Sequence, residues 1–479
     1  MSLKEICLVL LLSVALVAAA SRDRNRKKYK VVCYLGSWAN YRRGDGKFLI
    51  EHIDPFLCTH LVYGFAKLSG NKIAAYDPYL DLKEHWGLGA FARFNNMKKA
   101  NPELTTLIAI GGWNEGSIKY SKMASNPASR AIFVKSVVDF CLKYDFDGLD
   151  MDWEYPANRG GAKEDKENFI FLLKDLKEAF APYGLVLSAA VSAGQKTIDK
   201  AYDIAQVGKY LDIINVMTYD FHGSWENVTG HNAPLHARKE ESDEQKILNV
   251  DYAIQLWIKR GAPRNKIVLG MGLYGRSFTL AKPSENGIGA QVTGKGKGGV
   301  MTKEPGMLGY NEICLHVKQN GWNVVVPKGI EAPYAYFGNQ WVGYDDKKSI
   351  ALKVDYLIKE GLGGGMVWSL ETDDFRGKCF NEKYPLLTTI FTKLNGPVVR
   401  PTRDPKIVPT TEKPTTGRPK GFSCKKEGYF RDPQNCSRFF YCAKTSGNEF
   451  ARHAYSCGED TAFDELTSSC TFRERVPGC

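Results

Sequence analysis

Three acidic residues spaced by two are the most chemically informative feature of the sequence. Asp150, Asp152 and Glu154 lie in the segment DFDGLDMDWEYP, residues 145–156. Because side chains alternate in a β-strand, all three would point to the same side. Carboxyl groups packed this closely cannot all ionise freely, so one of them tends to retain a proton. A retained proton is what a general acid needs near neutral pH.

An exposed strand edge whose acids face water is the alternative explanation of this pattern. The residues between the acids are apolar, and strands of parallel barrels are covered on both faces, where unpaired acids are costly. We therefore favour a catalytic role for the three acids. Asp147 lies at the start of the same strand on the opposite side, and we expect it to support the strand.

Short apolar runs rich in β-forming residues recur along the chain and are predicted to be strands. Helical periodicity lies between many of them, as in residues 131–144 and 166–180. Strands that alternate with helices predict an α/β protein with a (β/α)8 TIM barrel, whose chemistry sits at the carboxyl ends of the strands. The eight predicted strands are Lys30–Leu35, Thr59–Ala66, Thr105–Ile110, Gly148–Trp153, Leu185–Val191, Ile213–Met217, Ile267–Met271 and Gly365–Trp368.

The chain is predicted to divide into a large and a small domain. The last two strands start 98 residues apart, so we expect an α+β insertion at about residues 278–345. Residues 397–421 are dominated by Pro and Thr, which is typical of an extended linker. The linker would separate a barrel domain, residues 21–396, from a small disulfide-rich β domain, residues 422–479.

The N-terminus predicts export. Lys4 precedes an apolar run that ends in three alanines at residue 20, which is typical of a secretory signal peptide, residues 1–20. A membrane anchor is the alternative, but the run is short for a bilayer span. We expect a secreted, extracellular protein with no membrane association. Asn227 and Asn435 lie in Asn-x-Ser/Thr sequons and are candidate glycosylation sites.

The net charge of +12 does not indicate nucleic-acid binding. Residues 21–29 carry five basic residues and one acidic residue, and the linker carries six and two, whereas residues 422–479 are balanced. Most of the excess therefore lies in tails and linkers and not on a folded face, and we expect no nucleic-acid partner.

Cysteine usage agrees with export. Six cysteines crowd into the last 56 residues, which indicates a three-disulfide framework with 15 possible pairings. Zinc binding is the alternative, but the segment lacks Cys-x-x-Cys pairs and has only His453 nearby. We expect neither a metal nor a cofactor.

The acidic segment resembles the signature of family 18 glycoside hydrolases, the chitinases, because DGLDMDWEYP fits Asp-x-x-Asp-x-Asp-x-Glu. The resemblance covers nearly all of residues 29–396. It includes four further segments, IAIGGWN (108–114), MTYDFHGSW (217–225), YGRSF (274–278) and GGGMVWSLETDDF (363–375).

The resemblance implies substrate-assisted, retaining catalysis, which needs no second carboxylate as nucleophile. Glu154 would protonate the glycosidic oxygen and later activate water, while the substrate's own N-acetyl carbonyl attacks the anomeric carbon to give an oxazolinium ion. Asp152 would orient and stabilise the acetamido N–H, and Asp150 would share its proton. Tyr219 would donate a hydrogen bond to the acetamido oxygen.

Aromatic residues at other strand ends would stack on the apolar faces of sugars. The resemblance implies that Trp368 forms the floor of the cleavage subsite. Three further tryptophans would follow the groove, Trp38, Trp113 and Trp225. The implied lining residues are Tyr34, Phe65, Met217, Asp220, Tyr274 and Arg276, and Glu304 is a further candidate contact. Ordinary core packing is the alternative for each ring, above all for Tyr34 and Phe65.

Residues 422–479 resemble peritrophin-A type chitin-binding domains through GYFRDPQNCSRFFYC (428–442) and the six cysteines. The resemblance implies the disulfides Cys424–Cys442, Cys436–Cys479 and Cys457–Cys470. The barrel resemblance adds Cys33–Cys58 and Cys314–Cys379. Cys141 lies in a helical apolar stretch, and we expect it to be a buried free thiol. Candidate sugar platforms, at least half of which we expect in a small aromatic core, are Tyr429, Phe430, Phe440, Tyr441 and Phe463.

We therefore expect a secreted, monomeric endochitinase that cleaves β-1,4 links between N-acetylglucosamine units and binds chitin and chitin oligosaccharides. The two modules together resemble arthropod proteins of peritrophic matrix or cuticle turnover. One alternative is an inactive lectin-like or growth-factor-like relative, in which the glutamate of the motif is replaced; here Glu154 is present. Another is an endo-N-acetylglucosaminidase that acts on glycoproteins, which the chitin-binding module disfavours.

Overall fold

The computed structural model describes residues 28–400, 422–445, 449–458, 461–465, 468–473, 476 and 478–479. The expected signal peptide, residues 1–20, and residues 401–421 of the expected linker lie outside these ranges. Within the described ranges, no helix is both long and apolar enough to cross a membrane.

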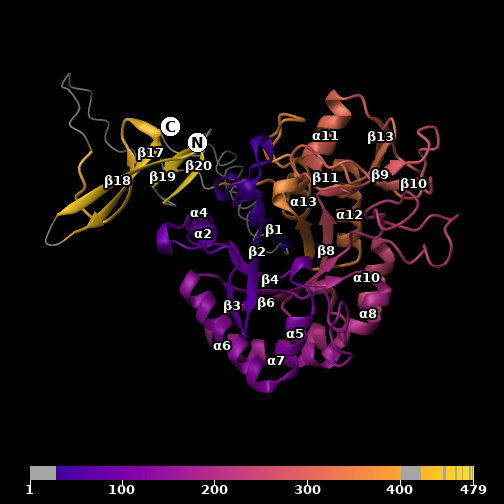
Figure 1. Cartoon of the computed structure of the whole chain (residues 1–479), viewed down its shortest axis with the longest axis horizontal. Helices are drawn as coiled ribbons and strands as arrows, with labels where there is room; N and C mark the ends of the chain where they lie inside the picture. The colour runs from indigo at the N-terminus through magenta and orange to yellow at the C-terminus, as the bar shows by residue number, and fades with distance from the viewer. Residues whose placement is uncertain are drawn as a thin grey trace, which may run out of the picture.

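A closed barrel of eight parallel strands forms the centre of the large domain (Figure 1). Strand β1 pairs with β2 on one side and with β15 on the other, which closes the barrel. In spatial order the strands are β1 (Lys30–Gly36), β2 (His60–Ser69), β4 (Thr105–Gly111), β5 (Gly148–Asp152), β6 (Val186–Ser192), β7 (Ile213–Met217), β8 (Ile267–Gly272) and β15 (Gly364–Trp368). Each overlaps one of the eight predicted strands, so the predicted TIM barrel is confirmed.

Helices surround the barrel (Figure 1), and local sequence explains where the longest of them begins. Helix α6 (Pro127–Tyr144) starts four residues before its apolar period because Asn126 caps it: Asn126 Oδ1 accepts a hydrogen bond from the Ala128 N–H at 2.8 Å. The other long helices of the ring are α5 (Ile118–Ser125), α7 (Asp165–Phe180), α10 (Val250–Lys259), α12 (Lys347–Lys359) and α13 (Pro385–Asn395).

Two apolar cores lie on the two faces of the barrel wall. The outer core, between strands and helices, includes Leu149 and Met151 of β5. The inner core fills the barrel and includes Val32 of β1 and Leu107 of β4. The side chains of one strand therefore divide between a helix-covered face and a barrel interior, as its alternation requires.

The predicted insertion is an antiparallel sheet with one helix. Its strands are β9 (Tyr274–Leu280), β10 (Val292–Lys295), β11 (Met307–Gly309), β12 (Asn323–Val325), β13 (Tyr334–Phe337) and β14 (Gln340–Gly343), and its helix is α11 (Tyr310–Gln319). The sheet begins at Tyr274, earlier than residue 278, because β9 follows β8 after the single residue Leu273.

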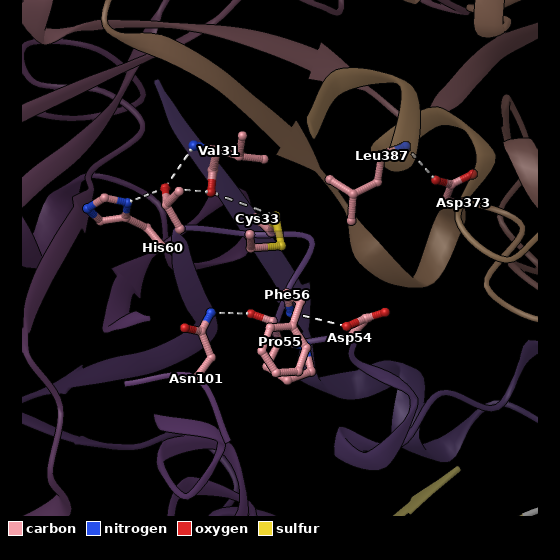
Figure 2. The surroundings of a disulfide bond; sticks show 11 residues. Val31, Cys33, Asp54, Pro55, Phe56, His60, Asn101, Asp373 and Leu387 are labelled. Atoms are coloured by element: carbon pink, nitrogen blue, oxygen red, sulfur yellow. Dashed lines mark hydrogen bonds between the residues drawn. A yellow bond between two sulfur atoms is a disulfide. The ribbon is translucent and has the colours of Figure 1, made fainter. Parts of the chain in front are cut away.

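Two disulfides of the large domain each join a residue within a strand or helix to a residue in a loop. Cys33 of β1 is bonded to Cys58, just before β2 (Figure 2), and Cys314 of α11 is bonded to Cys379. Beside the first disulfide, Asn101 donates a hydrogen bond to the Pro55 carbonyl at 2.8 Å (Figure 2). The Cys33–Cys58 disulfide and the Asn101–Pro55 hydrogen bond hold the segment between β1 and β2 against the barrel.

The small domain has a three-stranded antiparallel sheet and a two-stranded hairpin. The strands are β16 (Gly428–Asp432), β17 (Asn435–Lys444), β18 (Phe450–Ser456), β19 (Thr461–Asp464) and β20 (Ser469–Phe472). Its disulfides are Cys424–Cys442, Cys436–Cys479 and Cys457–Cys470, so all five pairs in the structure are those that the two resemblances imply. Cys141 is a buried free thiol, as expected.

Candidate functional site

The end of β5 carries the three acids that the sequence singles out. Asp150 and Asp152 are the third and last residues of the strand, and Glu154 follows two residues later. Because Leu149 and Met151 pack in the outer core, Asp150 and Asp152 face the barrel interior. Both aspartates are almost completely buried, whereas Glu154 is only partly buried at the mouth.

Two glycines at the end of β4 allow close approach to this site. Gly111 pairs with Asp152, and the Gly112 N–H donates to the Asp152 carbonyl at 2.8 Å. A Cβ on Gly111, at φ 115°, would collide with the Asp152 carbonyl, and one on Gly112 would lie 2.9 Å from the Phe65 ring. The glycine pair of IAIGGWN therefore lets β4 hold Asp152 from one side.

Asp150 is held as an acceptor by three donors. Its Oδ2 accepts a hydrogen bond from the Tyr34 hydroxyl at 2.8 Å, and its Oδ1 accepts from the Ser188 hydroxyl and from Asn215 Nδ2 at 3.2 Å. Burial raises the pKa of Asp150 to about 6, and the three hydrogen bonds oppose that rise by stabilising the carboxylate. Asp150 is therefore the acid of the row that is best prepared to carry the negative charge.

Asp152 has the opposite environment. Its Oδ1 is buried with no hydrogen-bond partner among the described residues. Burial first, and then the charges of Glu154 and Asp150, raise the pKa of Asp152 well above its usual value. A proton shared between Asp150 and Asp152 therefore resides on Asp152. The unpartnered Oδ1 of Asp152 is free to accept a hydrogen bond from a ligand.

Glu154 meets the requirement for a general acid near neutral pH. Burial raises the pKa of Glu154 to about 7, although Tyr155 and the charge of Arg159 oppose the rise. Arg159 Nη1 donates to the Glu154 carbonyl at 3.1 Å and to the Trp113 carbonyl at 2.8 Å. Its guanidinium lies 3.7 Å from the centre of the Trp113 ring. Arg159 thus holds the backbone of Glu154 in place.

A charged network follows β7. Asp220, at φ 59°, accepts hydrogen bonds from the Tyr274 hydroxyl at 2.6 Å and from Arg276 Nε and Nη2 at 2.6 and 2.7 Å. The Tyr219 ring packs edge-on against Tyr274, and its hydroxyl lies 3.8 Å from the Met366 sulfur. Arg276 also lies 5.4 Å from the centre of the Trp225 ring. Strand β9 of the insertion therefore anchors the loop that carries Tyr219.

Four aromatic rings gather at the ends of β1, β2 and β15. Trp368 lies 5.6 Å from Tyr34, 6.1 Å from Trp38 and 5.9 Å from Phe65, measured between ring centres. Trp38 and Phe65 are stacked with 11° between their planes. Of these rings Trp38 is 44% exposed and Trp368 partly so, which leaves apolar faces open to a ligand.

The expected lining residues divide into two groups. Trp113 and Trp225 are each 60% exposed, and Met217 and Phe65 are partly buried beside the inner core. Tyr34 and Tyr274 are instead 1% and 3% exposed, because their hydroxyls bond to Asp150 and Asp220 beneath the surface. The structure thus gives these two tyrosines a supporting place in the site and no open face for a sugar.

Several further residues have places that bear on the sequence predictions. Glu304 is exposed on the insertion and interacts electrostatically with Arg276. Asp147 accepts hydrogen bonds from the Thr106 N–H at 2.7 Å and from Lys98 Nζ at 2.9 Å, which ties β5 to its neighbours. The sequon residues Asn227 and Asn435 are both exposed, and their glycosylation stays a prediction.

Sequence reasoning missed Ser188, Asn215 and Arg159. A signal existed for Asn215, which is the one polar residue of the strand IINVM, and for Ser188 in the apolar strand VLSAAVS. A polar residue in a buried strand needs a partner, and Asp150 is that partner for both. Arg159 lies in a polar loop, where its residue type carries no such signal.

A groove elsewhere on the barrel domain has no part in this chemistry. It lies between β3 (Lys72–Ala75) and α6 and has a volume of about 740 Å³. Its walls include Ile73, Phe140 and several lysines, and it shares no lining residue with the acids of β5.

The small domain contains the aromatic residues expected to bind sugar. Phe440 and Phe463 are buried, while Tyr429, Phe430 and Tyr441 are partly exposed. The Tyr429 and Tyr441 rings lie 4.6 Å apart on one face of the sheet. Tyr429, Phe430 and Tyr441 are therefore the expected sugar platforms that keep exposed aromatic surface.

Comparisons with known families match both parts of the chain. Residues 30–373 match the model of glycosyl hydrolases family 18, and residues 424–479 match the model of the chitin binding peritrophin-A domain. The first match spans all eight barrel strands and the acidic row, and the second spans the six cysteines of the small domain.

Named relatives agree with these matches. The chain is 38% identical to mouse chitotriosidase-1, and the match covers 92% of this chain and 95% of the relative. It is 37% identical to the Manduca sexta endochitinase, and that match covers 84% of this chain and 74% of the relative. Among solved structures, it resembles the Ostrinia furnacalis Group IV chitinase with a TM-score of 0.74 and 45% identity, covering 76% of this chain and 98% of that one. The chain also resembles human YKL-39, described as a pseudo-chitinase, with a TM-score of 0.71 and 40% identity, covering 76% of this chain and 99% of that one.

Proposed function

The chain belongs to glycosyl hydrolase family 18 and is a chitinase with a chitin-binding domain, and from this premise we propose that it is a secreted endochitinase with substrate-assisted, retaining catalysis. Its substrate is the β-1,4 link between N-acetylglucosamine units of chitin. The relatives named chitotriosidase and endochitinase support this substrate.

The proposed reaction begins at Glu154. Its protonated carboxyl donates to the glycosidic oxygen, while the N-acetyl carbonyl of the sugar attacks the anomeric carbon and forms an oxazolinium ion. The glycosidic bond breaks, and its electron pair leaves with the departing sugar. Water then attacks the anomeric carbon after losing a proton to the Glu154 carboxylate, and the β-configuration is retained.

Asp150, Asp152 and Tyr219 act on the acetamido group. Asp152, with an unpartnered Oδ1, accepts a hydrogen bond from the acetamido N–H and orients its carbonyl for attack. Asp150, held by three donors, takes a share of the proton as positive charge develops on the oxazolinium ion. Tyr219, whose burial raises its pKa well above the usual value, stays a hydroxyl donor to the acetamido oxygen.

The observation that carries the proposal is the contrast along one row of acids. The Asp150 oxygens accept from three donors, Asp152 has an unpartnered acceptor oxygen, and Glu154 has a pKa of about 7. Asp150 and Asp152 are suited to act on the acetamido group, and Glu154 is suited to donate a proton. This division of roles is what a substrate-assisted mechanism requires. They leave no acid in the role of a nucleophile.

The small domain would hold the enzyme on insoluble chitin. We infer that a polysaccharide bound there raises the local concentration of cleavable chain near the barrel, because the two modules are tethered by one linker. With the expected signal peptide, this arrangement suits turnover of an extracellular chitin layer such as a peritrophic matrix or cuticle.

Hydrolysis of chitohexaose by the full chain tests the proposal. Glu154→Gln should lower kcat by about 10²–10⁴-fold, the range of a general acid, while Glu164→Gln, at an exposed glutamate of the next loop, should leave it unchanged. Full activity in Glu154→Gln would refute the mechanism. An inactive wild type that still binds the hexasaccharide would instead favour a binding protein, as YKL-39 is described.

A further inference from the structure

A single buried carboxylate connects the two segments that carry Trp38 and Trp368. Glu371 is 1% exposed and lies in the short helix η8 (Leu370–Thr372) that follows β15. Its Oε2 accepts a hydrogen bond from the Gly36 N–H at 3.0 Å, and its Oε1 accepts one from the Ser369 hydroxyl at 2.6 Å. Ser369 directly follows Trp368 in the chain.

Gly36 marks the other end of this link. It ends β1 and directly precedes the short helix η1 (Ser37–Tyr41), in which Trp38 is the second residue. A Cβ on Gly36 would collide with Glu371 Oε1 and lie 2.8 Å from Trp38 Cζ2. The carboxylate, the glycine backbone and the indole therefore occupy one tightly filled space.

Further contacts fix Glu371 itself. Asn311 of α11 donates a hydrogen bond to the Glu371 carbonyl at 3.2 Å, which ties its backbone to the insertion. Arg42 directly follows η1. Burial raises the pKa of Glu371, and the positive charge of Arg42 opposes that rise. Both ends of η1 thus interact with Glu371: Gly36 through its N–H and Arg42 through its charge.

We propose that Glu371 is a positioning residue that sets Trp38 and Trp368 at the spacing needed to hold an N-acetylglucosamine ring of the chitin chain. The inference rests on the proposed function, because it assumes that these two rings bind sugar. Glu371 has almost no exposed surface and reaches the sugar only through the two tryptophans. Their ring centres lie 6.1 Å apart with 40° between the planes. The carboxylate joins the Gly36 N–H of one segment to the Ser369 hydroxyl of the other.

Two substitutions separate hydrogen bonding from charge. Glu371→Gln keeps both links, because its carbonyl oxygen accepts from Gly36 while its amide donates to the Ser369 hydroxyl, which also accepts. Glu371→Leu has a similar size and loses both links. A role through hydrogen-bonded geometry therefore predicts that glutamine rescues what leucine impairs.

Kinetics on chitohexaose give the first test. We expect Glu371→Leu to raise KM about tenfold, which corresponds to about 1.4 kcal/mol of binding, with kcat within about twofold and the pH limits of kcat unchanged. Glu371→Gln should keep KM within about twofold of wild type. Ser369→Ala removes one link only and should raise KM about threefold, which keeps the test open if the leucine variant does not fold. The proposal would be overturned if a folded Glu371→Leu variant, or Ser369→Ala, kept the wild-type KM. It would also be overturned if Glu371→Gln raised KM as much as Glu371→Leu.

Binding without turnover separates this inference from the proposed function. In the Glu154→Gln background, calorimetry with chitohexaose should show binding, and added Glu371→Leu should weaken it about tenfold. No binding by the Glu154→Gln parent would contradict the proposed function itself. Equal binding by parent and double variant would overturn the positioning role alone.

Discussion

Removal of the Tyr34 hydroxyl tests how Asp150 and Asp152 divide their proton. The hydroxyl donates to Asp150 Oδ2 at 2.8 Å and accepts from Asn215 at 3.0 Å. Tyr34→Phe keeps the ring, and with it the contact to Trp368 at 5.6 Å between ring centres. It removes one of the three donors that stabilise the Asp150 carboxylate.

The expected size follows from the charge on the acceptor. A hydrogen bond to a charged group contributes about 1.5–3 kcal/mol, and 1.36 kcal/mol corresponds to one pKa unit. The pKa of Asp150, held at about 6 by burial against its three donors, should therefore rise by about one to two units. An Asp150 that keeps its own proton cannot take one from Asp152, so kcat/KM at pH 6 should fall about 5–50-fold, in proportion to the ionised fraction of Asp150.

The assay is kcat/KM on a chromogenic chitotrioside between pH 4 and 9. Because Asp150 must be ionised, a higher pKa moves the acidic limb of the profile upward, by about one to two units in Tyr34→Phe. Tyr356→Phe is the matched control, since its hydroxyl bonds to Asp251 between outer helices at 2.7 Å and should leave the profile unchanged. A Tyr34→Phe enzyme with wild-type kcat/KM and an unmoved acidic limb would refute this account of the pair.

Other predictions concern the alkaline limb, the fold and the small domain. Arg159→Gln should move the alkaline limb upward by less than about one unit, because the charge of Arg159 lowers the pKa of Glu154; the same pH profile measures it. Lys353→Met should lower the free energy of unfolding by about 3–5 kcal/mol in urea titration, since it leaves Asp345 as an unpaired charge in a pair that is 1% exposed on both sides. Removal of the Cys457 disulfide should cost the small domain about 3 kcal/mol and reduce retention on insoluble chitin, while chitohexaose is cleaved at the wild-type rate.

The barrel and the acidic row were predictable because both follow from periodicity. Eight apolar runs gave the strands, and a spacing of two placed Asp150 and Asp152 on one side of β5. Such patterns are local: each needs only the alternation of a strand or the period of a helix to be recognised.

The supporting residues were less predictable because they come from distant parts of the chain. Ser188 and Asn215 lie 38 and 65 residues from Asp150, and nothing in the spacing says which buried acid each will meet. Tyr34 and Tyr274 show the same limit, because their burial depends on where β1 ends and where β9 begins. That burial is set by packing across the barrel and not by the residues beside them in sequence.

The configuration of the first product tests the central claim most directly. Proton NMR during the first turnovers of chitohexaose resolves the anomers of the newly formed reducing ends before they equilibrate. Attack by the substrate's N-acetyl group followed by water, with Glu154 as acid and then base, predicts β-products. Initial α-products would mean direct inversion by water and would contradict the substrate-assisted role of Asp150, Asp152 and Glu154.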